Sequence, residues 1–172
     1  QIAKKTTIGI PQFQDNHIEL IDQNGIARNE DDFADRPIAL FFGFTYCPDV
    51  CPTTLTTLAT ARDDLESAGI DTKALQILFI TVDPERDTPE QLKQYLGLFD
   101  ANVTGLTGSP DQVRSVLQQF GVYAQKNDQG DGDYLYDHSA AVFLYCDDGS
   151  FKGTIVHNES IAFVTEKLKS IL

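Results

Sequence analysis

Residues 38–52 read IALFFGFTYCPDVCP, and this stretch decides the fold. Its first seven residues, Ile38–Phe44, form a continuous apolar run, which predicts a strand buried on both faces of a sheet. Two cysteines, Cys47 and Cys51, follow in a proline-containing loop. Leucines then recur at helical spacing up to Gly69, a residue type that commonly ends a helix. The stretch therefore predicts a central strand, a cysteine loop and a helix in direct succession.

Strand and helix signals continue along the rest of the chain. Leu75–Val82 predicts a second buried strand and Ala141–Tyr145 a third, because both are short apolar runs. Thr88 and Ser109 are helix-start signals, since each is a capping residue followed by proline and, at the third position, by glutamine. The third strand is expected to turn back at Asp148-Gly149, and an amphipathic helix ends the chain.

The flanking segments complete the expected topology. Residues 1–16 lack periodicity and predict an arm or edge element, while His17–Ile21 is a strand candidate with a hairpin turn at Asn24-Gly25. Residues 126–133 are polar and rich in Gly and Asp, which predicts a loop. Strands that alternate with helices predict a mixed sheet covered on both faces, and a cysteine motif between strand and helix is typical of a thioredoxin-like fold. We expect one thioredoxin-like α/β domain over residues 1–172, with an extra N-terminal hairpin.

Composition limits the classes of partner. The chain has 172 residues and a formal net charge of −13, with a globular hydrophobic fraction of 41%. Such an acidic protein would be repelled by nucleic acid and by anionic lipid. No run of about 18 apolar residues is present. Because the chain begins with Gln1, we expect a processed form that reaches a membrane only through an anchor outside this chain.

The cysteine pair carries the most specific chemistry. A loop between the carboxyl end of a strand and a helix N-terminus favours thiolates, because free N–H groups and the helix dipole stabilise negative charge. Cys47 and Cys51 are spaced Cys-x-x-x-Cys, which allows them to straddle a metal ion or to close a disulfide. Two thiolates form a soft site that favours Cu(I), with Zn(II) as competitor. Cys146 is expected to be a buried or half-buried strand residue beside a turn.

A third ligand must come from elsewhere in the chain. His138 precedes the strand at 140–145, where a thioredoxin would carry a cis-proline, and a histidine there offers a nitrogen ligand instead. Asp137 is expected to orient the imidazole from outside the metal shell. Asp83, at the end of the second strand, is expected either near the site or as a loop cap beside Pro84.

Three motifs together resemble the Sco/SenC family. They are residues 44–52 (FTYCPDVCP), residues 82–89 (VDPERDTP) and residues 137–139 (DHS), and the stretch at 106–108 also fits. The similarity extends from about residue 10 onward. It implies a thioredoxin fold with an extra hairpin and one copper per chain, as Cu(I) and also Cu(II), bound by Cys47, Cys51 and His138.

The resemblance also implies a partner and a location. Family members help to assemble the binuclear copper centre of cytochrome c oxidase, so the copper-centre subunit is the expected partner, with a second periplasmic copper chaperone or thiol-disulfide protein as another. The expected location is extracytoplasmic, at the periplasmic face of the bacterial cytoplasmic membrane, or alternatively in the mitochondrial intermembrane space.

Several functions remain open at this point. The first is a copper metallochaperone, and the second is a thiol-disulfide oxidoreductase that reduces the cysteines of the copper-receiving partner. A peroxidase is disfavoured because position 48 is proline where threonine would be needed. A structural zinc site normally has four protein ligands, whereas the candidate ligands in this chain are three, Cys47, Cys51 and His138.

Overall fold

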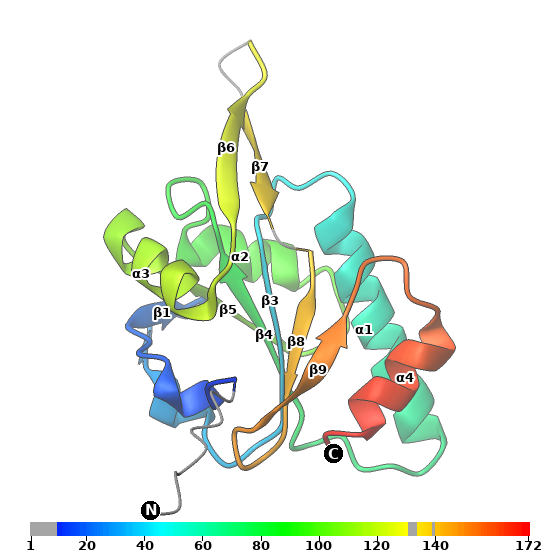
Figure 1. Cartoon of the computed structure of the whole chain (residues 1–172). Coiled ribbons are helices and arrows are strands. Elements are labelled where there is room, and N and C mark those ends of the chain that lie inside the picture. The colour runs from blue at the N-terminus through cyan, green and yellow to red at the C-terminus, as the bar shows by residue number, and fades with distance from the viewer. Residues whose placement is uncertain (1–9, 131–133, 139) are drawn as a thin grey trace, which may run out of the picture.

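The computed structural model describes residues 10–130, 134–138 and 140–172, apart from the side chain of Asp137, and has a mixed sheet at its centre (Figure 1). Seven strands lie in the order β2-β1-β5-β4-β3-β8-β9, and β6 pairs with β7 in a separate two-stranded ribbon. The central strands β3, β4 and β5 are parallel, whereas the outer pairs are antiparallel. The strands are β1 (Leu20–Asp22), β2 (Ala27–Arg28), β3 (Ile38–Gly43), β4 (Gln76–Thr81), β5 (Val103–Thr107), β6 (Ala124–Asp128), β7 (Tyr134–His138), β8 (Val142–Tyr145) and β9 (Phe151–Ile155).

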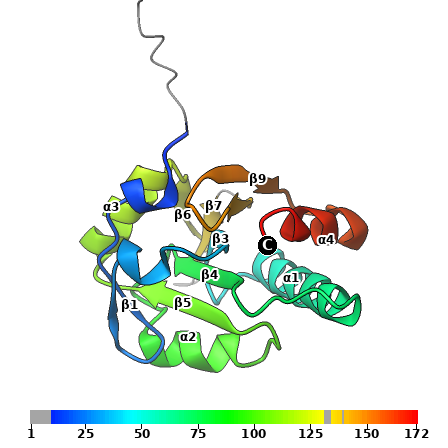
Figure 2. The same cartoon turned by 90° about the horizontal axis from the view of Figure 1, so that it is seen from below.

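Helices cover both faces of this sheet, as Figure 2 shows from below. On one face, α1, α2 and α4 pack over Ala39 and Phe41. On the other, α3 and two N-terminal 3-10 turns pack over Leu40 and Phe42. Successive residues of β3 therefore point into two different cores, which explains why the whole strand is apolar. The helical elements are α1 (Val50–Ser67), α2 (Pro89–Leu96), α3 (Pro110–Phe120), α4 (Ile161–Lys169), η1 (Phe13–Asp15) and η2 (Glu30–Phe33).

Local signals place the helix starts where the sequence predicts them. The Thr88 hydroxyl accepts a hydrogen bond from the Gln91 amide and caps α2. Ser109 and Gln112 form a reciprocal capping box at the start of α3. The expected mixed sheet with helices on both faces is confirmed, and so is the N-terminal hairpin, which turns at Gly25 with φ of 76°. Its first strand begins at Leu20 rather than at His17.

Strand β5 is not predicted from the sequence, because Gly105 interrupts its apolar pattern. Gly105 lies under α2, and a Cβ atom at this position would approach Leu96 Cδ1 to 2.5 Å. The absence of a side chain therefore lets the helix pack closely on the sheet.

The loop predicted over residues 126–133 is wrong for residues 126–128, which belong to β6, whereas residues 131–133 lie outside the described residues. The β6–β7 hairpin extends beyond the carboxyl ends of the central strands (Figure 1). His138 consequently ends β7, and β8 begins only at Val142.

The N-terminal arm packs against one of the two cores. Phe13 in η1 is 1% exposed, and its amide donates a hydrogen bond to the Gly149 carbonyl, so this part of the predicted arm or edge element covers the core on the α3 side of the sheet. Residues 1–9 lie outside the described residues, and the single domain over residues 1–172 stays a prediction. Among the described helices, none has the length and apolar character needed to cross a membrane.

Candidate metal centre

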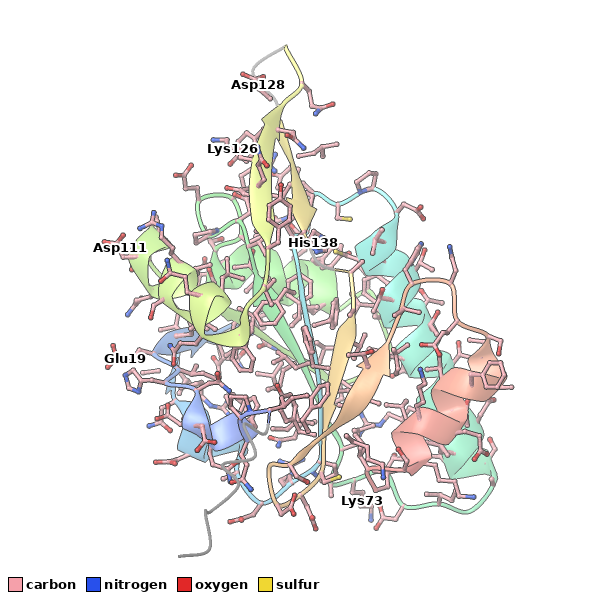
Figure 3. The ribbon with its side chains drawn as sticks, in the orientation of Figure 1. Glu19, Lys73, Asp111, Lys126, Asp128 and His138 are labelled. Atoms are coloured by element: carbon pink, nitrogen blue, oxygen red, sulfur yellow. The ribbon has the colours of Figure 1, made fainter. Side chains whose placement is uncertain are left out.

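Three side chains converge at the carboxyl end of the sheet. Cys47 lies in the loop after β3, Cys51 in the first turn of α1 and His138 at the end of β7. Their two sulfurs and an imidazole nitrogen all lie within 4.8 Å of one another, and the Cys51 Sγ atom is 3.9 Å from His138 Nε2. Figure 3 shows His138 at the base of the β6–β7 hairpin, beside the loop that leads into α1. Among the described residues, this is the one such group of three or more His, Cys, Asp or Glu side chains.

The buried sulfur of Cys51 depends on a glycine in β3. Cys51 is 1% exposed, and a Cβ atom added at Gly43 would come within 2.5 Å of its Sγ atom and 3.0 Å of the Phe79 ring. A side chain at position 43 would therefore occupy the space that the sulfur needs. Gly43 is not among the predicted site residues, although an isolated glycine in a strand often marks a close approach.

The two cysteines have opposite acid–base character. A hydrogen bond from the Cys51 thiol is the main cause that lowers the pKa of Cys47 to about 4, and a hydrogen bond from His138 lowers it further against the opposing effect of burial. The same hydrogen bond and burial raise the pKa of Cys51. None of the three cysteines forms a disulfide bond in the structure. The reduced pair therefore holds one thiolate, on the half-buried Cys47, and one thiol, on the buried Cys51.

Asp87 anchors the cysteine loop. Its buried carboxylate accepts hydrogen bonds from the Thr45 amide at 3.0 Å, the Thr45 hydroxyl at 2.7 Å and the Thr81 hydroxyl at 2.6 Å. Gln91 adds a hydrogen bond to the Thr45 hydroxyl at 3.0 Å. Burial raises the pKa of Asp87. Asp87 belongs to the motif at residues 82–89 but is not among the predicted site residues, because Thr45, which it holds, is distant in sequence.

Of the two aspartates predicted to lie near the site, only Asp83 can be placed. It is fully buried, accepts a hydrogen bond from Arg86 Nε at 2.5 Å and a second from the Tyr134 hydroxyl at 3.2 Å. Asp83 thus joins its own loop to the hairpin and does not contribute to the three-atom cluster. The side chain of Asp137 lies outside the described residues, so its orienting role stays a prediction.

The remaining cysteine and histidines lie apart from the cluster. Cys146 follows Tyr145, which pairs with Ile38 at the opposite end of β3 from Gly43. His17 pairs with Glu19 and Glu30 near the N-terminus, and the Glu30 carboxylate raises its pKa. His157 lines a groove between α1 and α4.

This chain belongs to the SCO1/SenC family, whose model matches residues 10–172. The mitochondrial SCO1 homolog 1 of Arabidopsis thaliana is 37% identical over 165 residues, which is 95% of this chain and 47% of that protein. The chain thus spans about half the length of this relative. The structure of Bradyrhizobium japonicum ScoI with copper bound has a TM-score of 0.81 and 38% identity, and the match covers 91% of this chain and 98% of that one.

Yeast Sco1 with copper bound matches with a TM-score of 0.80 and 34% identity over 90% of this chain and 86% of that chain. These similarities confirm the thioredoxin-like fold class.

The acid–base asymmetry predicts how the reduced, metal-free protein reacts with iodoacetamide. In a Cys146→Ser background, we expect Cys47 to be alkylated as a thiolate, with a midpoint near the pKa of about 4. Cys51→Ala removes the thiol that stabilises this thiolate, so the midpoint should rise, whereas Cys51→Ser retains a donor and should raise it less. The measurement is the alkylation rate against pH, by mass spectrometry. Equal midpoints in all three proteins would contradict the assignment.

The close approach at Gly43 predicts a coupled loss of stability. Gly43→Ala should lower the free energy of unfolding by about 1–3 kcal/mol, because the new methyl group overpacks the space beside the Cys51 sulfur. In a Cys51→Ala background the sulfur is absent, so the same substitution should cost less. Denaturant unfolding of the four proteins measures this difference. An equal cost in both backgrounds would show that the sulfur is not the atom that needs the space.

Proposed function

We propose that this chain is a copper metallochaperone that binds one copper ion through Cys47, Cys51 and His138. The observation that carries the proposal is the convergence of two sulfurs and one nitrogen within 4.8 Å at an edge of the sheet. Thiolates favour Cu(I), and three ligands suit Cu(I) better than structural Zn(II), which normally takes four. A nitrogen ligand beside the thiolates also allows the same site to accept Cu(II).

The three ligands would act in different ways during loading. Cys47 is half-buried and already a thiolate, so it is the ligand available for first contact with copper. Cys51 is buried and protonated, so it must lose its proton when it binds the metal, and copper binding should release a proton. Three protein ligands leave one side of the ion open, through which a partner's ligand can enter during transfer.

The family supports the identity of the metal and of its destination. Two of its solved structures, those of the Bradyrhizobium and yeast proteins, contain copper. We propose the copper-centre subunit of cytochrome c oxidase as the acceptor and assembly of its binuclear copper centre as the purpose. The net charge of −13 favours a basic docking face on the partner. We propose an extracytoplasmic or intermembrane-space location, and the mitochondrial relatives support it.

A thiol-disulfide reductase is the second candidate, and the acid–base asymmetry of the pair favours it. The Cys47 thiolate would attack one sulfur of a partner's disulfide and release the other as a thiolate. The Cys51 thiol would then lose its proton and attack Cys47, which releases the second partner thiolate and leaves Cys47–Cys51 as a disulfide. In this reaction His138 would serve only to stabilise the thiolate.

A Cu(I) titration distinguishes the two candidates. The reduced protein should bind one Cu(I) per chain in anaerobic competition with a chelator. His138→Ala should weaken the affinity by about tenfold or more, because even loss of a residue that orients a metal ligand commonly costs 10- to 100-fold. His17→Ala and His157→Ala are the matched controls and should leave the affinity unchanged. If His138→Ala binds Cu(I) as tightly as the parent protein, the three-ligand site is wrong and disulfide reduction becomes the leading function.

A further inference from the structure

Four side chains above the metal centre form a continuous stack of cations and aromatic rings. The guanidinium carbon of Arg86 lies 4.4 Å from the centroid of the Tyr46 ring and 3.6 Å from that of Tyr134. The ammonium nitrogen of Lys126 lies 3.9 Å from the same Tyr134 centroid. Figure 3 shows Lys126 on the hairpin, farther out than His138. Cations this close to ring faces are attracted by the negative charge of the π system.

The stack joins three segments that are far apart in sequence. Tyr46 precedes the first cysteine, Arg86 belongs to the loop after β4, and Lys126 and Tyr134 belong to the two strands of the hairpin. Asp83 fixes Arg86 and Tyr134 relative to each other, because its carboxylate accepts hydrogen bonds from both side chains. The cysteine loop and the hairpin are thus fastened to the same guanidinium group.

Aromatic ring contacts connect Tyr134 in the stack to His138 in the candidate metal centre. Tyr134, Tyr136 and His138 alternate along β7 and so share one face of the strand. The Tyr134 and Tyr136 ring centroids are 5.9 Å apart. Phe44 contacts both Tyr136 and His138 edge-to-face, with 5.8 Å between centroids in each pair.

We propose that Arg86 and Tyr134 are positioning residues, which hold the His138 imidazole against the cysteine loop. The effect on copper rests on the function proposed above, whereas the effect on the imidazole does not. Among the described residues, β6 and β7 pair with each other and not with the seven-stranded sheet. Side-chain contacts therefore help to fix the position of His138, and the stack supplies some of them through Tyr136 and Phe44.

A double-mutant cycle tests the proposal through copper. Tyr134→Leu removes the ring and keeps the Asp83–Arg86 ion pair, and we expect it to weaken Cu(I) binding by about two- to thirty-fold, the range of a cation–π contact. Tyr134→Phe keeps the ring, so its affinity for Cu(I) should stay within about twofold of that of the parent protein. In a His138→Ala background, Tyr134→Leu should change the affinity by less than about twofold, because the ligand it positions is absent. Where His138→Ala itself weakens Cu(I) binding, an equal loss in both backgrounds would overturn the proposal, as would no loss in the parent.

A second readout does not need the metal. In the reduced, metal-free protein, the imidazole of His138 should give one narrow NMR cross-peak, and Tyr134→Leu should broaden or split it. Tyr134→Phe should leave the cross-peak unchanged. The control variant Tyr123→Leu should also leave it unchanged, because Tyr123 is exposed and lies just before β6. An unchanged His138 signal in Tyr134→Leu would overturn the proposal whatever the copper data show. A changed signal, together with Cu(I) binding that does not need His138, would leave the positioning role intact and reject the copper site.

Discussion

The arrangement of the candidate metal centre depends on the hydrogen bonds that the buried carboxylate of Asp87 accepts. This carboxylate accepts hydrogen bonds from Thr45, two residues before Cys47, and from Thr81 at the end of β4. Burial of a carboxylate is costly unless such bonds are made, and here they tie the cysteine loop to the neighbouring parallel strand. The loop that begins at Asp83 then reaches the hairpin through Arg86. One short segment therefore sets the spacing between the cysteines and His138.

The same scaffold makes the two sulfurs chemically unequal. Gly43 gives the Cys51 sulfur a buried place beside the strand, while Cys47 remains half-buried in the loop. Burial and the hydrogen bond between the pair keep the proton on Cys51 and leave Cys47 as the thiolate. Such a pair is prepared both for metal capture and for attack on a disulfide, which explains why both chemistries can arise from one site. His138 distinguishes them, because only metal binding requires its nitrogen as a ligand.

Local signals in the sequence account for much of the fold. The apolar run of β3 and the capped starts of α2 and α3 are predictable because periodicity and capping involve neighbouring residues. Strand β5 could not be predicted in this way, since Gly105 serves the packing of α2. Strand β6 has a polar sequence, and the β6–β7 hairpin is held by tyrosines that contact residues far away in the chain. The candidate ligands could be chosen from residue type and spacing, but the roles of Gly43, Asp87 and Arg86 appear only in the tertiary contacts.

The most direct test of the central claim is X-ray absorption spectroscopy at the copper edge of the protein loaded with one Cu(I), alongside the His138→Ala variant. A centre built from Cys47, Cys51 and His138 predicts two sulfur scatterers and one nitrogen scatterer in the parent protein, with the nitrogen lost in the variant. An identical sulfur-only environment in both proteins would contradict the account, because His138 would then lie near the copper without binding it.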